Sequence, residues 1–311
     1  MTNFTNSFER TVDIQNLIAV QNQMPLMKTI YDELLLTGNA FLAFRKNEAT
    51  VYYKGNNLCT LRDRNKYAPD IFMRFLPLSR SKLLRGNQGK RVTEPEWKAS
   101  EGTTCSWDSI LPEILDNIEK DSSPESRLVS ELYKFSPVCN PNGDIVLLDV
   151  EVEFEGKSVR TGTKTLVDRI DVLLYHCVEK RLVFIEVKRL SDDRLEPQKG
   201  QRPEIIDQLE EYKSVINDPD YISHFNNQYK KVLDYYAKIR NGFPVYEIEN
   251  PPMLGLLLTE FTRSKKDTER VKEIEKAVSQ MGIGVCAIGN TESATESTLG
   301  KWYRIIKKYT K

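Results

Sequence analysis

The spacing of apolar residues divides the chain into two regions with different element orders. In the first hundred residues, apolar positions at helical intervals predict a helix over Met24 to Leu36. Three short runs typical of strands follow, and Gly55-Asn56 between the last two is a turn signal. The runs cover Ala40 to Arg45, Thr50 to Lys54 and Asn57 to Leu61. We therefore expect a small α+β unit that carries a hairpin.

Beyond about residue 105 the order of the elements becomes regular. We expect a helix, three strands, two helices, a buried strand, a helix and a further strand. In order they cover Pro124 to Phe135, Ile145 to Phe154, Arg169 to Tyr175, Leu182 to Lys188, Pro203 to Ile216, Tyr221 to Arg240, Met253 to Glu260, Asp267 to Met281 and Ile283 to Ile288. The last segment, Trp302 to Tyr309, fits either a strand or a helix. This order predicts an α/β fold with a mixed sheet flanked by helices.

A polar stretch from Arg85 to Thr104 separates the two regions. It is rich in Gly, Lys, Glu and Ser, a composition typical of a linker or mobile loop. We therefore expect a smaller α+β domain over residues 1–105 and a larger domain over residues 106–311.

Composition narrows the class of protein. With 311 residues, 40% of them hydrophobic and 29% charged, the chain is long enough to bury a core. No apolar run approaches the roughly 18 residues of a membrane helix, and the N-terminus is polar, so a cytoplasmic protein without membrane contact is expected. The five cysteines are widely spaced and odd in number, which argues against a disulfide framework and a zinc cluster. Any metal is therefore expected to bind mainly to oxygen ligands.

The charge distribution is more informative than the net charge, which is zero. From Leu61 to Val92 the chain carries nine basic residues against two acidic ones. Such a surplus can attract a polyanion, because contacts with phosphates release condensed counterions. A solvated loop that happens to be basic explains the same surplus, and the sequence leaves both interpretations open.

Charged residues interrupt two apolar strands in the second region. Asp171 lies in the strand from Arg169 to Tyr175, and Glu186-Val187-Lys188 ends the strand that follows a short polar hairpin. Because side chains alternate along a strand, Glu186 and Lys188 project to one side and Val187 to the other. Buried ions are costly without partners, and a lone ion pair often fails to offset its desolvation. A bound cation would offset it.

The short hairpin makes the two strands antiparallel neighbours. Asp171 and Glu186 are then expected at the same end of adjacent strands, within reach of one metal ion. Two carboxylates together with a main-chain carbonyl, here that of Val187, suit Mg²⁺, which keeps several of its waters.

Asp171 followed by Glu186-Val187-Lys188 resembles the signature of the PD-(D/E)XK, or restriction-endonuclease-like, nuclease superfamily. The resemblance implies an αβββαβ core in which Asp171 and Glu186 bind Mg²⁺ or Mn²⁺. Lys188 would position the attacking water and stabilise the charge on the phosphate. A proline is missing before Asp171, where Arg169-Ile170 stands instead, and this departure lowers the specificity of the match.

Two flanking helices add to the resemblance. Glu125 lies on the apolar face of the first helix, where superfamily members often carry a glutamate that supports the metal site. Gln208 and Tyr212 have the Q-x-x-x-Y spacing of exonuclease-type members, in which the pair lines the active site. Alternative interpretations remain: Glu125 as a first-turn acid that favours the helix N-terminus, Tyr212 as a core residue and Gln208 as a boundary residue.

The connection from Arg189 to Arg202 carries charges of both signs. Its basic residues, Arg194 among them, could close over substrate phosphates beside the catalytic strand, and an ordinary solvated loop is the competing interpretation.

The resemblance implies a metal-dependent nuclease that cleaves DNA, with RNA left open as a substrate. It also suggests defence against foreign DNA, and either a homodimer or a partner protein bound through the N-terminal domain. A catalytically inactive nucleic-acid-binding or assembly module with the same fold is the alternative. A third interpretation is an unrelated α/β protein in which Asp171, Glu186 and Lys188 form a structural ion network.

Overall fold

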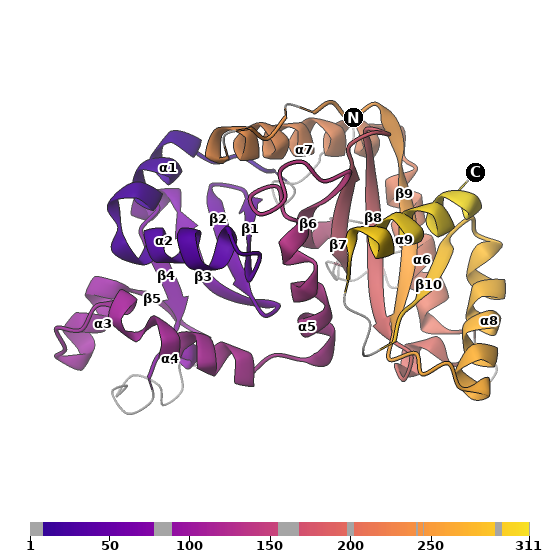
Figure 1. Ribbon diagram of the computed structural model, residues 1–311, viewed down its shortest axis with the longest axis horizontal. Coiled ribbons are helices and arrows are strands. Elements are labelled where there is room, and N and C mark those ends of the chain that lie inside the picture. The colour runs from indigo at the N-terminus through magenta and orange to yellow at the C-terminus, as the bar shows by residue number, and fades with distance from the viewer. Residues whose placement is uncertain are drawn as a thin grey trace, which may run out of the picture. The chain divides into compact units, whose positions relative to one another are not determined.

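The computed structural model describes residues 9–77, 89–154, 168–197, 202–240, 242–244, 246–289 and 294–310. The chain forms two compact units, and each is built on a five-stranded sheet (Figure 1). We call residues 9–141 with 234–243 the N-terminal unit, and residues 142–233 with 244–310 the C-terminal unit. Within these ranges, no helix is long and apolar enough to cross a membrane.

The sheet of the N-terminal unit is antiparallel throughout, with the strands in chain order. Its strands are β1 (Ala40–Arg45), β2 (Glu48–Tyr53), β3 (Asn56–Arg62), β4 (Pro69–Phe72) and β5 (Arg91–Thr93). Its helices are α1 (Ile14–Gln23), α2 (Pro25–Thr29) with the π-helical continuation η2 (Ile30–Leu35), α3 (Glu94–Glu101), α4 (Trp107–Lys120) and α5 (Pro124–Glu131). Short 3-10 turns are η3 (Asp63–Asn65), η4 (Met73–Phe75) and η6 (Tyr133–Phe135). The expected α+β unit and its hairpin are therefore present.

Glycine is required at the turn between β2 and β3. Lys54 and Gly55 both have positive φ, of 49° and 77°, as the tight hairpin turns with right-handed twist demand. A Cβ on Gly55 would also lie 2.6 Å from Cα of Ser126 at the start of α5. The turn lies one residue earlier than the expected Gly55-Asn56.

The expected linker is wrong for residues 91–101, which form β5 and α3. Thr93 caps α3 in a capping box: its main-chain N–H donates to Glu96 Oε2 at 2.7 Å. Trp97 on the same helix is 1% exposed and adds to the core of the unit. Polar composition concealed this helix, although Thr93 followed three residues later by Glu96 is a recognisable start signal.

The division between the units falls at residues 141 and 142, not near residue 105. Helix α4 contacts β2, β3 and α2, so the residues just after 105 belong with the N-terminal sheet. Ile114 and Ile118 on α4 are fully buried. The apolar face of this helix therefore completes the N-terminal core.

The C-terminal unit has a mixed sheet with the strand order β10-β9-β8-β7-β6. Strands β6, β7 and β8 form an antiparallel meander, and β9 and β10 run parallel to β8. The strands are β6 (Ile145–Phe154), β7 (Asp168–His176), β8 (Arg181–Arg189), β9 (Asn250–Thr259) and β10 (Gly284–Ala287). The helices are α6 (Glu204–Ile216), α7 (Pro219–Ile239), α8 (Lys265–Ser279) and α9 (Glu296–Tyr309), with a 3-10 turn η7 at Asp193–Leu195. The expected α/β class and mixed sheet are confirmed.

The last segment is the helix α9, which crosses in front of the sheet in Figure 1. Thr295 begins it by accepting a hydrogen bond from the N–H of Thr298 at 3.1 Å. Leu299, Trp302, Tyr303 and Ile306 are buried at helical spacing. Contact with the sheet decides between the two structures that the sequence left open.

Strand β8 lies at the centre of this sheet and is buried from Leu182 to Lys188. A central strand with parallel pairing on one side is covered on both faces, which explains its nearly continuous apolar sequence. The two ionic side chains at its end, Glu186 and Lys188, are therefore carried into the interior.

Candidate functional site

Strands β7 and β8 bring Asp171 and Glu186 together. Their antiparallel register sets Val172 opposite Ile185, and the next residues outward on the two strands are Asp171 and Glu186. The main-chain N–H of Val187 donates to Asp171 Oδ2 at 2.7 Å. The carboxylate of Asp171 thus accepts the hydrogen bond that a main-chain carbonyl of β7 would otherwise accept from Val187. Asp171 itself is half-buried, so one side of this group of residues remains accessible.

Glu186 and Lys188 form a buried ion pair. They are 1% and 4% exposed, and Lys188 Nζ donates to Glu186 Oε1. The same ammonium lies 3.3 Å from the carbonyl oxygen of Val187. Glu186 Oε2 is also buried, but it has no hydrogen-bond partner among the described residues. An ionised carboxylate with one unsatisfied oxygen is costly at this depth.

The electrostatics of the site favour an added positive charge. Burial raises the pKa of Glu186 to about 8, and the negative charge of Asp171 acts in the same direction. The positive charges of Lys188 and Arg194 and the hydrogen bond from Lys188 lower this pKa, without offsetting the burial. A cation near the two carboxylates would stabilise the ionised form of both.

The donor set fits a magnesium or manganese ion. Asp171 and Glu186 supply carboxylate oxygens, and Val187 supplies a main-chain carbonyl oxygen on the same strand end. Within the described ranges, no group of three or more His, Cys, Asp or Glu side chains is arranged to hold a metal. An ion here would therefore complete its coordination with water, as Mg²⁺ commonly does.

Gln208 and Tyr212 reach the site through the backbone of β7. Gln208 Nε2 donates to Tyr212 Oη at 2.7 Å, and Tyr212 Oη donates to the carbonyl oxygen of Arg169 at 2.8 Å. Arg169 precedes Asp171 by two residues on the same strand. Tyr212 is 1% exposed, so its ring belongs to the core, and its hydroxyl fixes α6 against the strand that carries Asp171.

Glu125 is not brought together with the other site residues within one unit. It lies in the first turn of α5, which belongs to the N-terminal unit. Ser123 caps this helix by accepting a hydrogen bond from the N–H of Ser126 at 3.1 Å. An acid in the first turn interacts favourably with the helix dipole, which accounts for a glutamate at this position.

Sequence reasoning did not single out Asp149, a second buried acid of the sheet besides Glu186. It is 1% exposed on β6, is paired in register with Leu173, and accepts a hydrogen bond from Tyr229 Oη at 2.8 Å. Residues paired in register project to the same face, and this face also carries Asp171. An acid within the apolar run from Ile145 to Val150 was the available signal.

Some of the basic residues between Leu61 and Val92 form ion pairs within the sheet of the N-terminal unit. Arg62 and Arg91 both pair with the buried Asp70, with Arg91 Nη1 3.0 Å from Asp70 Oδ1. The guanidinium of Arg91 also lies 3.9 Å from the centre of the Phe72 ring. Arg64, Lys66 and Lys90 are exposed, whereas Arg80, Lys82 and Arg85 lie outside the described residues.

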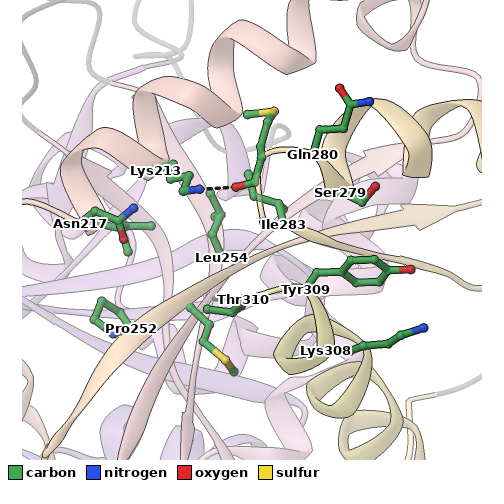
Figure 2. Close-up of a pocket in the computed structure, with 14 residues that line it drawn as sticks. Lys213, Asn217, Pro252, Leu254, Ser279, Gln280, Ile283, Lys308, Tyr309 and Thr310 are labelled. Atoms are coloured by element: carbon green, nitrogen blue, oxygen red, sulfur yellow. Dashed lines mark hydrogen bonds between the residues drawn. The ribbon is translucent and has the colours of Figure 1, made fainter.

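A cavity of about 310 Å³ lies at the other end of the C-terminal sheet (Figure 2). It is bounded by the last turns of α6, α8 and α9, and Lys213 Nζ donates across it to the carbonyl oxygen of Met281. Leu254 in its wall pairs with Phe184, four residues before Lys188, which corresponds to roughly 13 Å along the strand. The cavity is therefore separate from the charged site.

No protein-family model, curated protein or solved structure matches this chain in the comparisons. A function for this protein is therefore proposed from the geometry of β7 and β8.

Proposed function

We propose that the C-terminal unit is a metal-dependent nuclease that hydrolyses phosphodiester bonds in DNA, with Mg²⁺ or Mn²⁺ as its cofactor. The observation that carries the proposal is the buried carboxylate of Glu186, which lies beside Asp171 and Lys188 and has one oxygen without a hydrogen-bond partner in the part of the chain that the structure describes. A structural ion pair would be expected to satisfy both oxygens, whereas a metal site leaves a lone pair for the ion.

Each residue has a defined role in this proposal. Asp171, Glu186 and the carbonyl of Val187 would hold the ion. Once bound, the metal would polarise the phosphate and lower the pKa of a water molecule. Lys188 would orient the attacking water by hydrogen bonding and place its positive charge against the developing negative charge of the phosphate. Tyr212 would keep β7 in place through the Arg169 carbonyl.

The topology of the unit supports the same proposal. The three-stranded meander, the helix α6 and the strand β9, which is parallel to β8, follow the last five elements of the αβββαβ order implied by the sequence resemblance, with the helix α7 as an addition between α6 and β9. The helix α5, expected as the first element, belongs to the N-terminal unit instead. We therefore place the proposed activity in β7, β8 and α6, without a role for Glu125.

The test combines cleavage with metal binding. Circular and linear DNA are incubated with the wild type, Glu186→Gln or Lys188→Ala in Mg²⁺, Mn²⁺ or EDTA. We expect metal-dependent cleavage that falls more than about 100-fold in Glu186→Gln, since loss of a residue that merely supports a ligand already costs 10- to 100-fold. Mn²⁺ should also raise the Tm of the wild type but not that of Glu186→Gln.

Asp70→Asn is the matched control, because Asp70 is a buried, ion-paired acid of the other unit. This variant should lower the Tm and keep the Mn²⁺-dependent rise. An inert wild type, together with equal Mn²⁺ responses in Glu186→Gln and Asp70→Asn, would exclude the proposal.

The second candidate is a catalytically inactive nucleic-acid-binding or assembly module. It is favoured by the two-carboxylate donor set, which lacks a third acidic side chain among the described residues. DNA binding by the wild type without cleavage in any metal would support this function over hydrolysis.

A further inference from the structure

The turn after β8 places a charged pair next to the candidate site. The main-chain N–H of Asp192 donates to the carbonyl of Arg189 at 2.9 Å, and that of Leu195 donates to the carbonyl of Asp192 at 3.1 Å. The chain therefore reverses within a few residues of Lys188. Asp192 and Arg194 remain close to the end of the catalytic strand as a result.

Asp192 holds the guanidinium of Arg194 in one orientation. Arg194 Nε lies 3.0 Å from Asp192 Oδ1 and Arg194 Nη2 lies 2.6 Å from Oδ2, which is a bidentate pair. The side chain of Asp192 is 12% exposed, whereas that of Arg194 is 42% exposed. Asp192 is thus largely buried and holds the guanidinium in place, whereas Arg194 is accessible to solvent.

The turn itself is attached on two sides. Ser191 Oγ donates to Glu260 Oε2 at 2.8 Å, just beyond the end of β9. Arg270 on α8 donates to the carbonyl oxygen of Asp192 at 3.4 Å and lies 3.1 Å from Glu196. These contacts hold the turn against the C-terminal unit, so Arg194 loses little additional freedom when it binds a ligand.

Electrostatic coupling links this pair to the site. Arg194 lies within electrostatic range of the Glu186 carboxylate, and Lys188 lies within electrostatic range of the Asp192 carboxylate. Lys188 and Arg194 therefore both interact with the carboxylates of Glu186 and Asp192. Two cations at the end of one strand suit a ligand with successive negative charges.

We propose that Arg194, oriented by Asp192, binds a backbone phosphate of the nucleic acid next to the one that reacts at Lys188. This inference rests on the proposed function, because it takes DNA as the ligand. A planar guanidinium binds phosphate in a bidentate manner, whereas the buried ammonium of Lys188 acts as a point charge. Arg194 would therefore fix the register of the substrate strand, and Lys188 would act at the scissile bond.

The test measures binding of a short DNA duplex in EDTA over a range of salt concentrations, so that no cleavage interferes. Arg194→Ala should weaken binding and reduce the slope of log K against log[salt] by about 0.9, the value for one lost phosphate contact. Arg194→Lys retains the charge, and it should keep the slope while binding more weakly than the wild type.

Arg189→Ala is the matched control. Arg189 is also 42% exposed and ion-paired, with Glu260 at 2.8 Å, and it adjoins Lys188 in sequence. It should keep the wild-type slope. Equal slopes for Arg194→Ala and Arg189→Ala, or no DNA binding by the wild type at low salt, would overturn the inference.

Cleavage is recorded separately, so the two proposals fail in different ways. If the wild type cleaves no DNA but the salt slope of binding falls in Arg194→Ala, the proposed hydrolysis is excluded and the phosphate contact is supported. If the wild type cleaves DNA but Arg194→Ala binds DNA with the wild-type affinity and slope, the phosphate contact is excluded and the proposed hydrolysis is retained.

Discussion

Burial changes the behaviour of two titratable side chains in the β7–β8 meander. It raises the pKa of Glu186 and lowers that of His176, because in both cases it disfavours the charged form. The ring of His176 lies 4.0 Å from that of Tyr303, and its Nδ1 accepts a hydrogen bond from the N–H of Glu179 at 3.2 Å. The charges of Glu179 and Asp144 raise the pKa of His176 and that of Lys307 lowers it, and the effect of burial remains larger.

The lowered pKa of His176 predicts a loss of stability in acid. The unfolded chain takes up a proton as the pH falls below about 6.5, whereas the folded protein resists protonation down to a lower pH. The contribution of His176 is therefore complete above about pH 6.5 and is lost below it. Urea unfolding at several pH values should show this loss in the wild type and a smaller one in His176→Phe, which keeps a ring against Tyr303. Parallel curves for the two proteins would contradict the prediction.

At the scale of elements, two glycines allow α9 to approach the sheet closely. Gly255 on β9 and Gly284 on β10 are paired in register, and both face Ile306. A Cβ on Gly255 would lie 2.5 Å from Cδ1 of Ile306, at the end of a flexible side chain. A Cβ on Gly284 would lie 2.6 Å from Cα of Ile306, in the helix backbone. The helical period of the sequence predicts the buried face of α9, but not this close approach.

These contacts predict an order of stability among three alanine variants. Gly284→Ala should destabilise the protein by about 2–3 kcal/mol, because the helix must shift, and Gly255→Ala by about 1 kcal/mol, because a side chain can rotate. Gly300→Ala is the control: it is inside α9, and apart from the adjoining turns of its own helix no described atom lies within 4 Å of the position that its methyl group would take. It should stabilise by roughly 0.5–1 kcal/mol. Chemical unfolding measures all three, and equal losses for Gly284→Ala and Gly255→Ala would refute the packing argument.

At the scale of the whole molecule, one helix contributes to both units. Residues 219–233 of α7 belong to the C-terminal unit, and the remainder of the helix belongs to the N-terminal unit. Tyr236 is fully buried, donates from Oη to the carbonyl of Leu42 at 2.5 Å, and has its ring 5.2 Å from that of Phe44. Phe225, earlier in the helix, has its ring 5.7 Å from that of Phe184 on β8. The N-terminal core is therefore completed by residues far along the chain.

Truncation at the two parts of α7 should weaken different sheets. Tyr236→Ala should lower the stability of the N-terminal unit by about 3–5 kcal/mol, the usual range for a buried aromatic side chain. Hydrogen exchange should then accelerate in β1 and β2. Phe225→Ala is the reciprocal control and should accelerate exchange in β7 and β8. Identical exchange patterns in the two variants would contradict the division of the helix between the units.

The sequence by itself determined the elements of the C-terminal unit, because apolar period and turn residues are local properties. It predicted β6 to β10 within a few residues and marked Asp171, Glu186 and Lys188, since ions in apolar strands are conspicuous. Tertiary structure alone decided the assignment of α4 and α5 to the N-terminal unit and the helical state of α9. It also decided that Glu186 Oε2 has no hydrogen-bond partner among the described residues. The physical reason is that a period identifies the face an element buries, whereas the partner that covers it depends on residues far away in the chain.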